Sequence, residues 1–262
     1  MDILVLKLLA TPILIGVATL IGRRWGQAVG GWLVGLPLTS APIAFFLALE
    51  RGTQFAADAS NGSLLGIAAE STFCVAYAAC ARRLGWPGSL MVGSIAFAAA
   101  VGALDALLPL SRPFPLVIAL CVLAAALQMM PRFTPGTPMA SAPRWDLPAR
   151  MIATTTLVIV LTGVAGWLGP ELSGIVATYP LFASVLAVFG HRQLGADAAL
   201  NVLRGLMLGL FSFAAFFVVL GETIVLLGIA RSFAAATIAA VAAQGLSLQI
   251  VRRSVRRARS GR

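Results

Sequence analysis

Residues 8–105 recur at 151–248 with a constant offset of 143 and no gap. Seven of the thirteen glycines in the first copy fall on glycines in the second, whereas chance would give about one, because 26 of 262 residues are glycine. The fold must therefore accommodate the same unit twice. The matched glycines are Gly26, Gly31, Gly52, Gly62, Gly66, Gly85 and Gly102, and Pro37-Leu38 falls on Pro180-Leu181.

The chain is too apolar for a soluble fold. It is 60% hydrophobic and 11% charged, with a mean hydropathy of +0.96, whereas a soluble domain carries about 25% charged residues. Its apolar runs have the length of about 20 residues that a helix needs to cross a bilayer. Because a span must satisfy its own backbone hydrogen bonds in lipid, these runs predict helices and an all-α polytopic membrane protein.

Nine spans are predicted from the apolar runs and the segments between them. Their expected ranges are 3–22, 28–49, 62–81, 88–108, 114–130, 150–168, 172–190, 200–221 and 232–251.

The distribution of basic residues predicts the orientation of these spans. With the N-terminus outside, fifteen of the nineteen basic residues lie in cytoplasmic segments, six of them in the tail at 252–262. This asymmetry follows the positive-inside rule, so the net charge of +10 indicates a membrane topology and no nucleic-acid partner. The Arg- and Ala-rich composition suggests a bacterial inner membrane, with the C-terminus in the cytoplasm.

An odd number of spans inverts the second copy relative to the first. The predicted organisation is a four-span repeat at 1–110, a linking span with a proline-rich linker at 111–149, an inverted repeat at 150–251 and a polybasic tail at 252–262. Inverted repeats are typical of secondary transporters. The arrangement resembles that of small carriers of the drug/metabolite transporter type, which have five plus five spans, whereas this chain lacks a tenth.

The second and seventh spans are each interrupted near the middle by a proline beside hydroxyl groups. Equivalent interruptions in two halves are the best sequence indication of a transporter's binding site. We expect each proline to free a carbonyl one turn earlier, on Leu33 and Val176; the alternative is a pair of kinks that only shape packing. The predicted substrate-binding residues are Pro37, Thr39, Ser40, Thr178, Tyr179, Pro180 and Ser184.

Glu70 is the second candidate, near the middle of the third span. A carboxylate at that depth costs at least about 2.5 kcal/mol on insertion scales, so it should face the interior, partnered or protonated. Such a group suits proton coupling. The alternative is a protonated, purely structural Glu70 hydrogen-bonded to a neighbouring hydroxyl. Its repeat equivalent is Phe213, so a coupling role would break the symmetry.

The other polar residues give weaker indications of a functional site. His191, the single histidine, is expected at a helix end, and Arg204 is expected to reach the cytoplasmic face or attract an anionic substrate. No metal-site spacing or cofactor motif occurs, and Cys74, Cys80 and Cys121 lie inside apolar runs as packing residues. We expect no metal and no cofactor.

Several functions fit these patterns. A secondary transporter of a small neutral or amphipathic solute is favoured, driven by a proton or ion gradient or by facilitated flow, with membrane lipids and the solute as its partners. A non-transporting membrane scaffold or assembly protein is the alternative. An intramembrane enzyme is disfavoured because clustered His, Asp or Cys residues are lacking, and a channel because no ring of charges appears. Substrate, direction and oligomeric state are not determined by the sequence.

Overall fold

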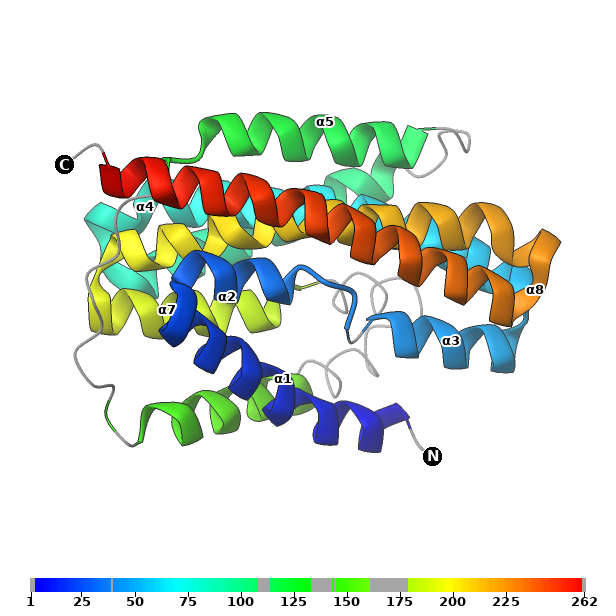
Figure 1. The fold of residues 1–262 in the computed structure, drawn as a ribbon, viewed down its shortest axis with the longest axis horizontal. Helices are drawn as coiled ribbons and strands as arrows, with labels where there is room; N and C mark the ends of the chain where they lie inside the picture. The colour runs from blue at the N-terminus through cyan, green and yellow to red at the C-terminus, as the bar shows by residue number, and fades with distance from the viewer. Residues whose placement is uncertain are drawn as a thin grey trace.

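The computed structural model describes residues 3–38, 40–107, 114–132, 143, 145–160 and 179–260. All regular secondary structure in these ranges is helical, as predicted, and most helices run side by side along the long direction of the molecule (Figure 1). The helices are α1 (Ile3–Trp25), α2 (Gln27–Val34), α3 (Ser40–Arg51), α4 (Thr53–Leu107), α5 (Phe114–Met129), α7 (Leu181–Leu194) and α8 (Ala196–Ser260), with a further helix at 146–160.

Three helical stretches among the described residues are long and apolar enough to cross a membrane: Thr53–Leu104, Ala196–Leu227 and Ile229–Gln249. Pro115–Met129 is apolar but shorter. Large aliphatic side chains such as Ile13, Leu226 and Ile238 are exposed on the helix surfaces. Exposed aliphatic groups of this size suit contact with lipid, so the chain is a helical protein with segments that can span a membrane.

Each of the two longest helices folds back on itself at a glycine. Gly85 divides α4 into arms at 53–84 and 86–107, and Gly228 divides α8 into arms at 196–227 and 229–260. The two glycines have φ of 65° and 76° with ψ near 180°, a conformation open almost only to glycine. Figure 1 shows the second arm of α8, in orange to red, returning beside the first.

The turns occur at equivalent positions of the two copies. Gly85 and Gly228 are 143 residues apart, as are Gly52 and Gly195. Gly52 separates α3 from α4 and Gly195 separates α7 from α8, with φ of 91° and 89°. The predicted spans at 62–81, 200–221 and 232–251 each lie inside one arm, and the span at 88–108 does so up to Leu107, where the described part of its arm ends. The sequence repeat is therefore also a repeat of helix boundaries, and the arms are longer than the predicted spans.

Replacing Gly85 or Gly228 with alanine should destabilise the protein. Each substitution forces a Cβ into a backbone conformation that costs about 1–3 kcal/mol for other residues, measurable as a lower midpoint of thermal unfolding in detergent. The matched controls are Gly102→Ala and Gly245→Ala, also repeat equivalents, which have no positive φ and no described atom near an added Cβ. These should be neutral or stabilising, because alanine favours a helix; equal losses at all four positions would contradict the argument.

The two copies contact each other through glycines between α2 and the first arm of α8. A Cβ on Gly205 would meet the carbonyl of Ala28, and one on Gly209 would meet the carbonyl of Trp32 and the Cα of Gly35. On the opposite side, a Cβ on Gly31 would meet the carbonyl of Val202. The Gly205-xxx-Gly209 pattern therefore packs the halves together, because small residues four apart let two helices approach closely.

Segments predicted to share the cytoplasmic side lie at one end of the molecule. The ends of α1, α5, α7 and α8 gather there, whereas the N-terminus, the end of α3 and the turn of α8 lie at the other end (Figure 1). Arg82 pairs with Asp197 at 2.8 Å there. Arg204 donates to the carbonyls of Leu127, Met130 and Pro131, and so caps α5.

Two boundaries differ from the expected ones. The helix at 146–160 begins inside the predicted linker at 131–149. Of the linker prolines only Pro148 lies within this helix, in its first turn, where a helix tolerates proline. At the other end, α8 continues through the predicted tail to Ser260. No glycine or proline occurs between Gly245 and Gly261, so nothing in this stretch breaks the helix.

Candidate functional site

The second span is broken where the sequence predicts. Helix α2 ends at Val34 and α3 begins at Ser40, with Pro37 between them. The amide of Leu38 donates to the carbonyl of Leu36 at 2.8 Å, and the amide of Ala41 donates to the carbonyl of Pro37 at 2.9 Å. The chain thus makes a tight turn and starts a new helix.

The second copy contains the same turn before α7. The amide of Leu181 donates to the carbonyl of Tyr179 at 2.7 Å, and the amide of Ser184 donates to the carbonyl of Pro180 at 2.8 Å. Each of these bonds is the equivalent, 143 residues later, of a bond around Pro37. The turn at the proline and the helix that starts after it are therefore properties of the repeated unit.

The carbonyl expected to be free in the first break is not free. Leu33 accepts a hydrogen bond from the amide of Leu36 at 3.1 Å, because the chain tightens into a turn after Val34 instead of continuing as a kinked helix. The neighbouring carbonyl of Trp32 accepts from the Gln244 side chain at 3.0 Å. The equivalent prediction for Val176 lies outside the described residues.

The predicted binding residues are distributed around the two breaks. Pro37 and Pro180 are buried, and Ser40 is half-buried at the start of α3. Ser184 is buried, and its hydroxyl donates to the carbonyl of Pro180 at 2.6 Å, so in this structure the hydroxyl proton is bound to the backbone of the turn. Thr39 and Thr178 lie outside the described residues.

Tyr179 is held in an aromatic and polar environment formed by both arms of α4. Its hydroxyl lies 2.9 Å from Oγ of Ser94. Its ring meets Phe73 edge-on at 5.8 Å and Phe97 edge-on at 5.4 Å, between ring centroids. Ser94 and Phe97 were not predicted as site residues, because within an apolar run nothing distinguishes them until the arms fold together.

Glu70 lies on the first arm of α4, one turn before Phe73. Residues three and four apart on a helix share a face, so Glu70 lies on the face that carries Phe73 and its contact with Tyr179. The side chain is half-buried. The hydroxyls of the adjacent Ser71 and Thr72 donate to the carbonyls of Ile67 and Ala68, at 2.7 and 2.9 Å. Neither hydroxyl therefore has a proton left to donate to an ionised Glu70.

Tyr77 and His191 link the same arm of α4 to the end of α7. The Tyr77 hydroxyl lies 3.1 Å from Nδ1 of His191, and Tyr77 is fully buried. Burial lowers the pKa of His191 despite a hydrogen bond with the backbone of Ala81. His191 does lie at a helix end, as expected, but its ring reaches into the bundle.

A small cavity of about 20 Å³ adjoins the first break. This is close to the volume that one water molecule requires. Its lining side chains are all apolar and come from both copies, so any polar partner for a bound group must be a backbone atom. The lining residues are Leu14, Ala18, Leu33, Val34, Leu36, Leu38 and Phe182.

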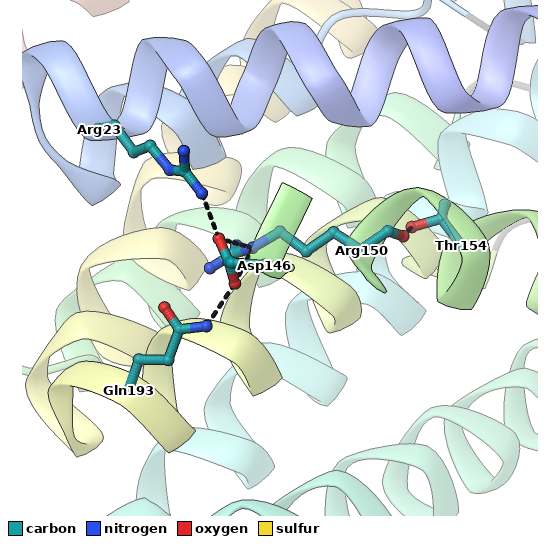
Figure 2. Close-up of polar contacts among 5 residues, drawn as sticks. All are labelled: Arg23, Asp146, Arg150, Thr154 and Gln193. Atoms are coloured by element: carbon teal, nitrogen blue, oxygen red, sulfur yellow. Dashed lines mark hydrogen bonds and ion pairs between the residues drawn. The ribbon is translucent and has the colours of Figure 1, made fainter. Parts of the chain in front are cut away.

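A buried charge cluster joins the two copies away from the breaks (Figure 2). The carboxylate of Asp146, at the start of the helix at 146–160, is fully buried and accepts from Arg23 at 2.6 Å. It also accepts from Nε of Arg150 at 3.0 Å and from Gln193 at the end of α7. Arg150 in turn lies over the ring of Phe189 at 4.9 Å. From the sequence alone, Arg23 and Arg150 are only two of the basic residues that set the orientation, and nothing distinguishes Asp146.

The surroundings of Asp146 determine its ionisation. Burial on its own would raise the pKa of this carboxyl. The hydrogen bond from Arg23, the charge of Arg150 and the hydrogen bonds from Gln193 and Arg150 together hold the pKa below its ordinary value. Asp146 is thus a carboxylate at neutral pH.

The lowered pKa of Asp146 predicts a pH-dependent contribution to stability. In the unfolded chain an aspartate titrates near its ordinary pKa of about 3.9. The stabilisation should be fully present above that value and be lost as the pH falls through the lower folded pKa. The difference in thermal midpoint between the wild type and Asp146→Asn should therefore be constant near neutral pH and shrink below about pH 4. A difference that grows on acidification would contradict this assignment.

Within the described ranges no group of three or more His, Cys, Asp or Glu side chains could hold a metal ion. The three cysteines are free. Comparison with known proteins gave no match: no family model, no curated protein and no solved structure is significantly similar to the chain.

Proposed function

We propose that the chain is a secondary transporter of a small neutral or amphipathic solute, which alternates access between two inverted repeats of four spans. The observation that carries the proposal is the pair of backbone turns at Pro37 and Pro180, which have matching hydrogen bonds and are each followed by a helix. Broken helices at equivalent positions of two repeats are how many carriers build a site near the middle of the bilayer. The proposed substrate-binding segments are the two breaks.

The proposed substrate class follows from the few charges near the breaks. The cavity beside the first break is apolar, and Tyr179 beside the second presents aromatic edges and one hydroxyl pair. An apolar wall with a small number of polar groups suits a ligand that is neutral or amphipathic. A multiply charged solute would lack partners among the described residues that line the breaks.

Glu70 is the proposed proton carrier. It is the half-buried carboxyl on the face of α4 that meets Tyr179, and the hydroxyls beside it are committed to helix carbonyls. A carboxyl group that can bind and release a proton at this depth gives the carrier a coupling group. Coupling through Glu70 makes the two halves functionally unequal, because its equivalent is Phe213.

The proposed location is a bacterial inner membrane, with nine spans, the N-terminus outside and the C-terminus in the cytoplasm. The end of the molecule that collects Arg23, Arg82 and Arg204 would then face the cytoplasm. The basic end of α8 would meet anionic lipid headgroups there, at about 1 kcal/mol per residue.

The proposal is tested by flux. Purified protein is reconstituted into liposomes that contain a pH dye, and a panel of neutral and amphipathic metabolites is added outside. We expect protein-dependent, saturable uptake of at least one class, accompanied by proton movement. Uptake without proton movement would keep the carrier and remove the coupling role of Glu70. If protein shown to be folded moves none of the panel, the scaffold alternative is favoured.

A further inference from the structure

The cluster around Asp146 connects the two repeats at a single, buried point. Arg23 lies in the last turn of α1 in the first copy, whereas Asp146 and Arg150 begin the helix at 146–160 that leads into the second copy, and Gln193 lies near the end of α7 in the second copy (Figure 2). The only contact in the cluster that crosses between copies is the one from Arg23 to Asp146. Arg150, four residues after Asp146 on the same helix, holds the carboxylate in place from within its own copy.

The burial of this pair distinguishes it from the other ion pair at the same end. The Asp146 side chain has no exposed surface, whereas Arg82 and Asp197 are 62% and 52% exposed. An exposed pair contributes little, whereas removing one partner of a buried carboxylate weakens its compensation, which without Arg23 would come from Arg150 and the bond from Gln193. Breaking the Arg23 contact should therefore change the structure at this end, and breaking the Arg82 contact should not.

The start of the chain has no equivalent of this cluster at the repeat offset of 143 residues. The residues 143 positions before Asp146, Arg150 and Gln193 are Ile3, Lys7 and Glu50, and the residue 143 positions after Arg23 is Gly166. The acid that receives the arginine is thus replaced by isoleucine, and the arginine itself by glycine. Any connection that the cluster makes between the copies acts at one end of the molecule alone.

We propose that Asp146 and Arg23 form a latch that keeps the two repeats closed at this end, and that the latch must separate for the end to open. This inference rests on the proposed function, because opening and closing are the motion of a carrier. Arg150 and Gln193 are the positioning residues of the latch. Asp197 and Arg82, at the same end, are not part of it.

The test measures access to one native thiol. Cys74 is fully buried on the arm of α4 that faces α7. With Cys80 and Cys121 replaced by alanine, the rate at which a polar thiol reagent modifies Cys74 in nanodiscs reports opening between these helices. A second reporter, Ala56→Cys in a chain without native cysteines, monitors a buried position near the opposite end of the same arm.

In Arg23→Gln and Asp146→Asn we expect modification of Cys74 to accelerate about tenfold or more, because each variant removes the bond that joins α1 to the helix at 146–160, whereas Arg150 pairs with Asp146 only within its own helix. Modification at position 56 should stay unchanged or slow down. Asp197→Asn is the matched control and should behave as the wild type. Arg23 is the better variant if Asp146→Asn folds poorly, because its side chain is partly exposed.

Unchanged modification of Cys74 in folded Arg23→Gln would overturn the latch, as would equal acceleration at both reporters, which would indicate general loosening. The readout does not depend on flux. If modification of Cys74 accelerates in protein that transports nothing, the latch is retained and the carrier function is rejected. If the protein transports a solute but modification of Cys74 is unchanged, the carrier function is retained and the latch is rejected.

Discussion

Glu70→Gln should abolish substrate-driven proton movement in reconstituted liposomes, with a decrease of at least about tenfold to the leak background. The reason is that an amide of the same shape cannot bind and release a proton as a carboxyl group does. Uptake of substrate down its own gradient should be retained to a larger extent. The measurement pairs dye-reported proton flux with uptake of the same substrate. Thermal unfolding of the variant should be close to that of the wild type, since the hydroxyls next to Glu70 already bond to their own helix.

Glu222→Gln provides the control for this prediction. Glu222 lies on the first arm of α8 and is exposed, so its neutralisation should leave both fluxes unchanged. If Glu70→Gln retains full proton movement, Glu70 is structural and coupling must be assigned elsewhere. A variant that loses its fold together with flux would be uninformative by flux alone, so Glu70→Asp, which keeps the acid, is compared in the same assay; recovery of proton movement in Glu70→Asp supports the coupling role.

Gly209→Ala should give a large loss of stability. Its added methyl group would meet the carbonyl of Trp32 and the Cα of Gly35, and backbone atoms cannot rotate away as a side chain can. Overpacking costs about 1–3 kcal/mol in ordinary cores, and we expect the upper end, about 3 kcal/mol, because α2 must separate from α8. Thermal unfolding in detergent measures the loss. Trp32 lies at the contact, so its fluorescence should also change.

Gly245→Ala, on the second arm of α8, serves as the comparison for this substitution. An added methyl group there has no described atom within 4 Å, so the same change in composition should cost nothing. If Gly209→Ala were as stable as Gly245→Ala, the close approach of α2 and α8 would be wrong. The transport assay adds a second readout, because the contact lies at the entrance to the first break.

Much of the local structure could be predicted because its causes are local. Apolar runs of bilayer length become helices whatever surrounds them, since lipid offers no other hydrogen-bond partners. Proline at 37 and 180 interrupts a helix from within, because it removes a donor and clashes with the preceding turn. The repeat predicted the same local structure in both copies, and the matching bonds to Leu36, Pro37, Tyr179 and Pro180 confirm it for the turn and for the helix start that follows.

The helix boundaries agree less closely with the prediction from the sequence. The arms of α4 and α8 extend beyond the predicted spans, because polar residues such as Arg82 and Asp197 form helix outside the apolar run when they can pair. The carbonyl of Leu33 was expected to be free, but a tight turn satisfied it. Hydropathy measures where lipid is favourable and not where a helix ends, so these differences could not be read from the apolar pattern.

By itself the sequence determined the helical class, the repeated unit, the two interruptions and the glycines that turn or pack the chain, since each depends on a residue's own backbone preference or on its affinity for lipid. Only the tertiary structure decided which side chains meet: Ser94 and Phe97 at Tyr179, Tyr77 at His191, Arg204 at the end of α5, and Arg23 at Asp146. These partners are separated by between 73 and 123 residues where hydrogen bonds join them. A contact of that kind depends on how whole helices pack, which no local pattern encodes.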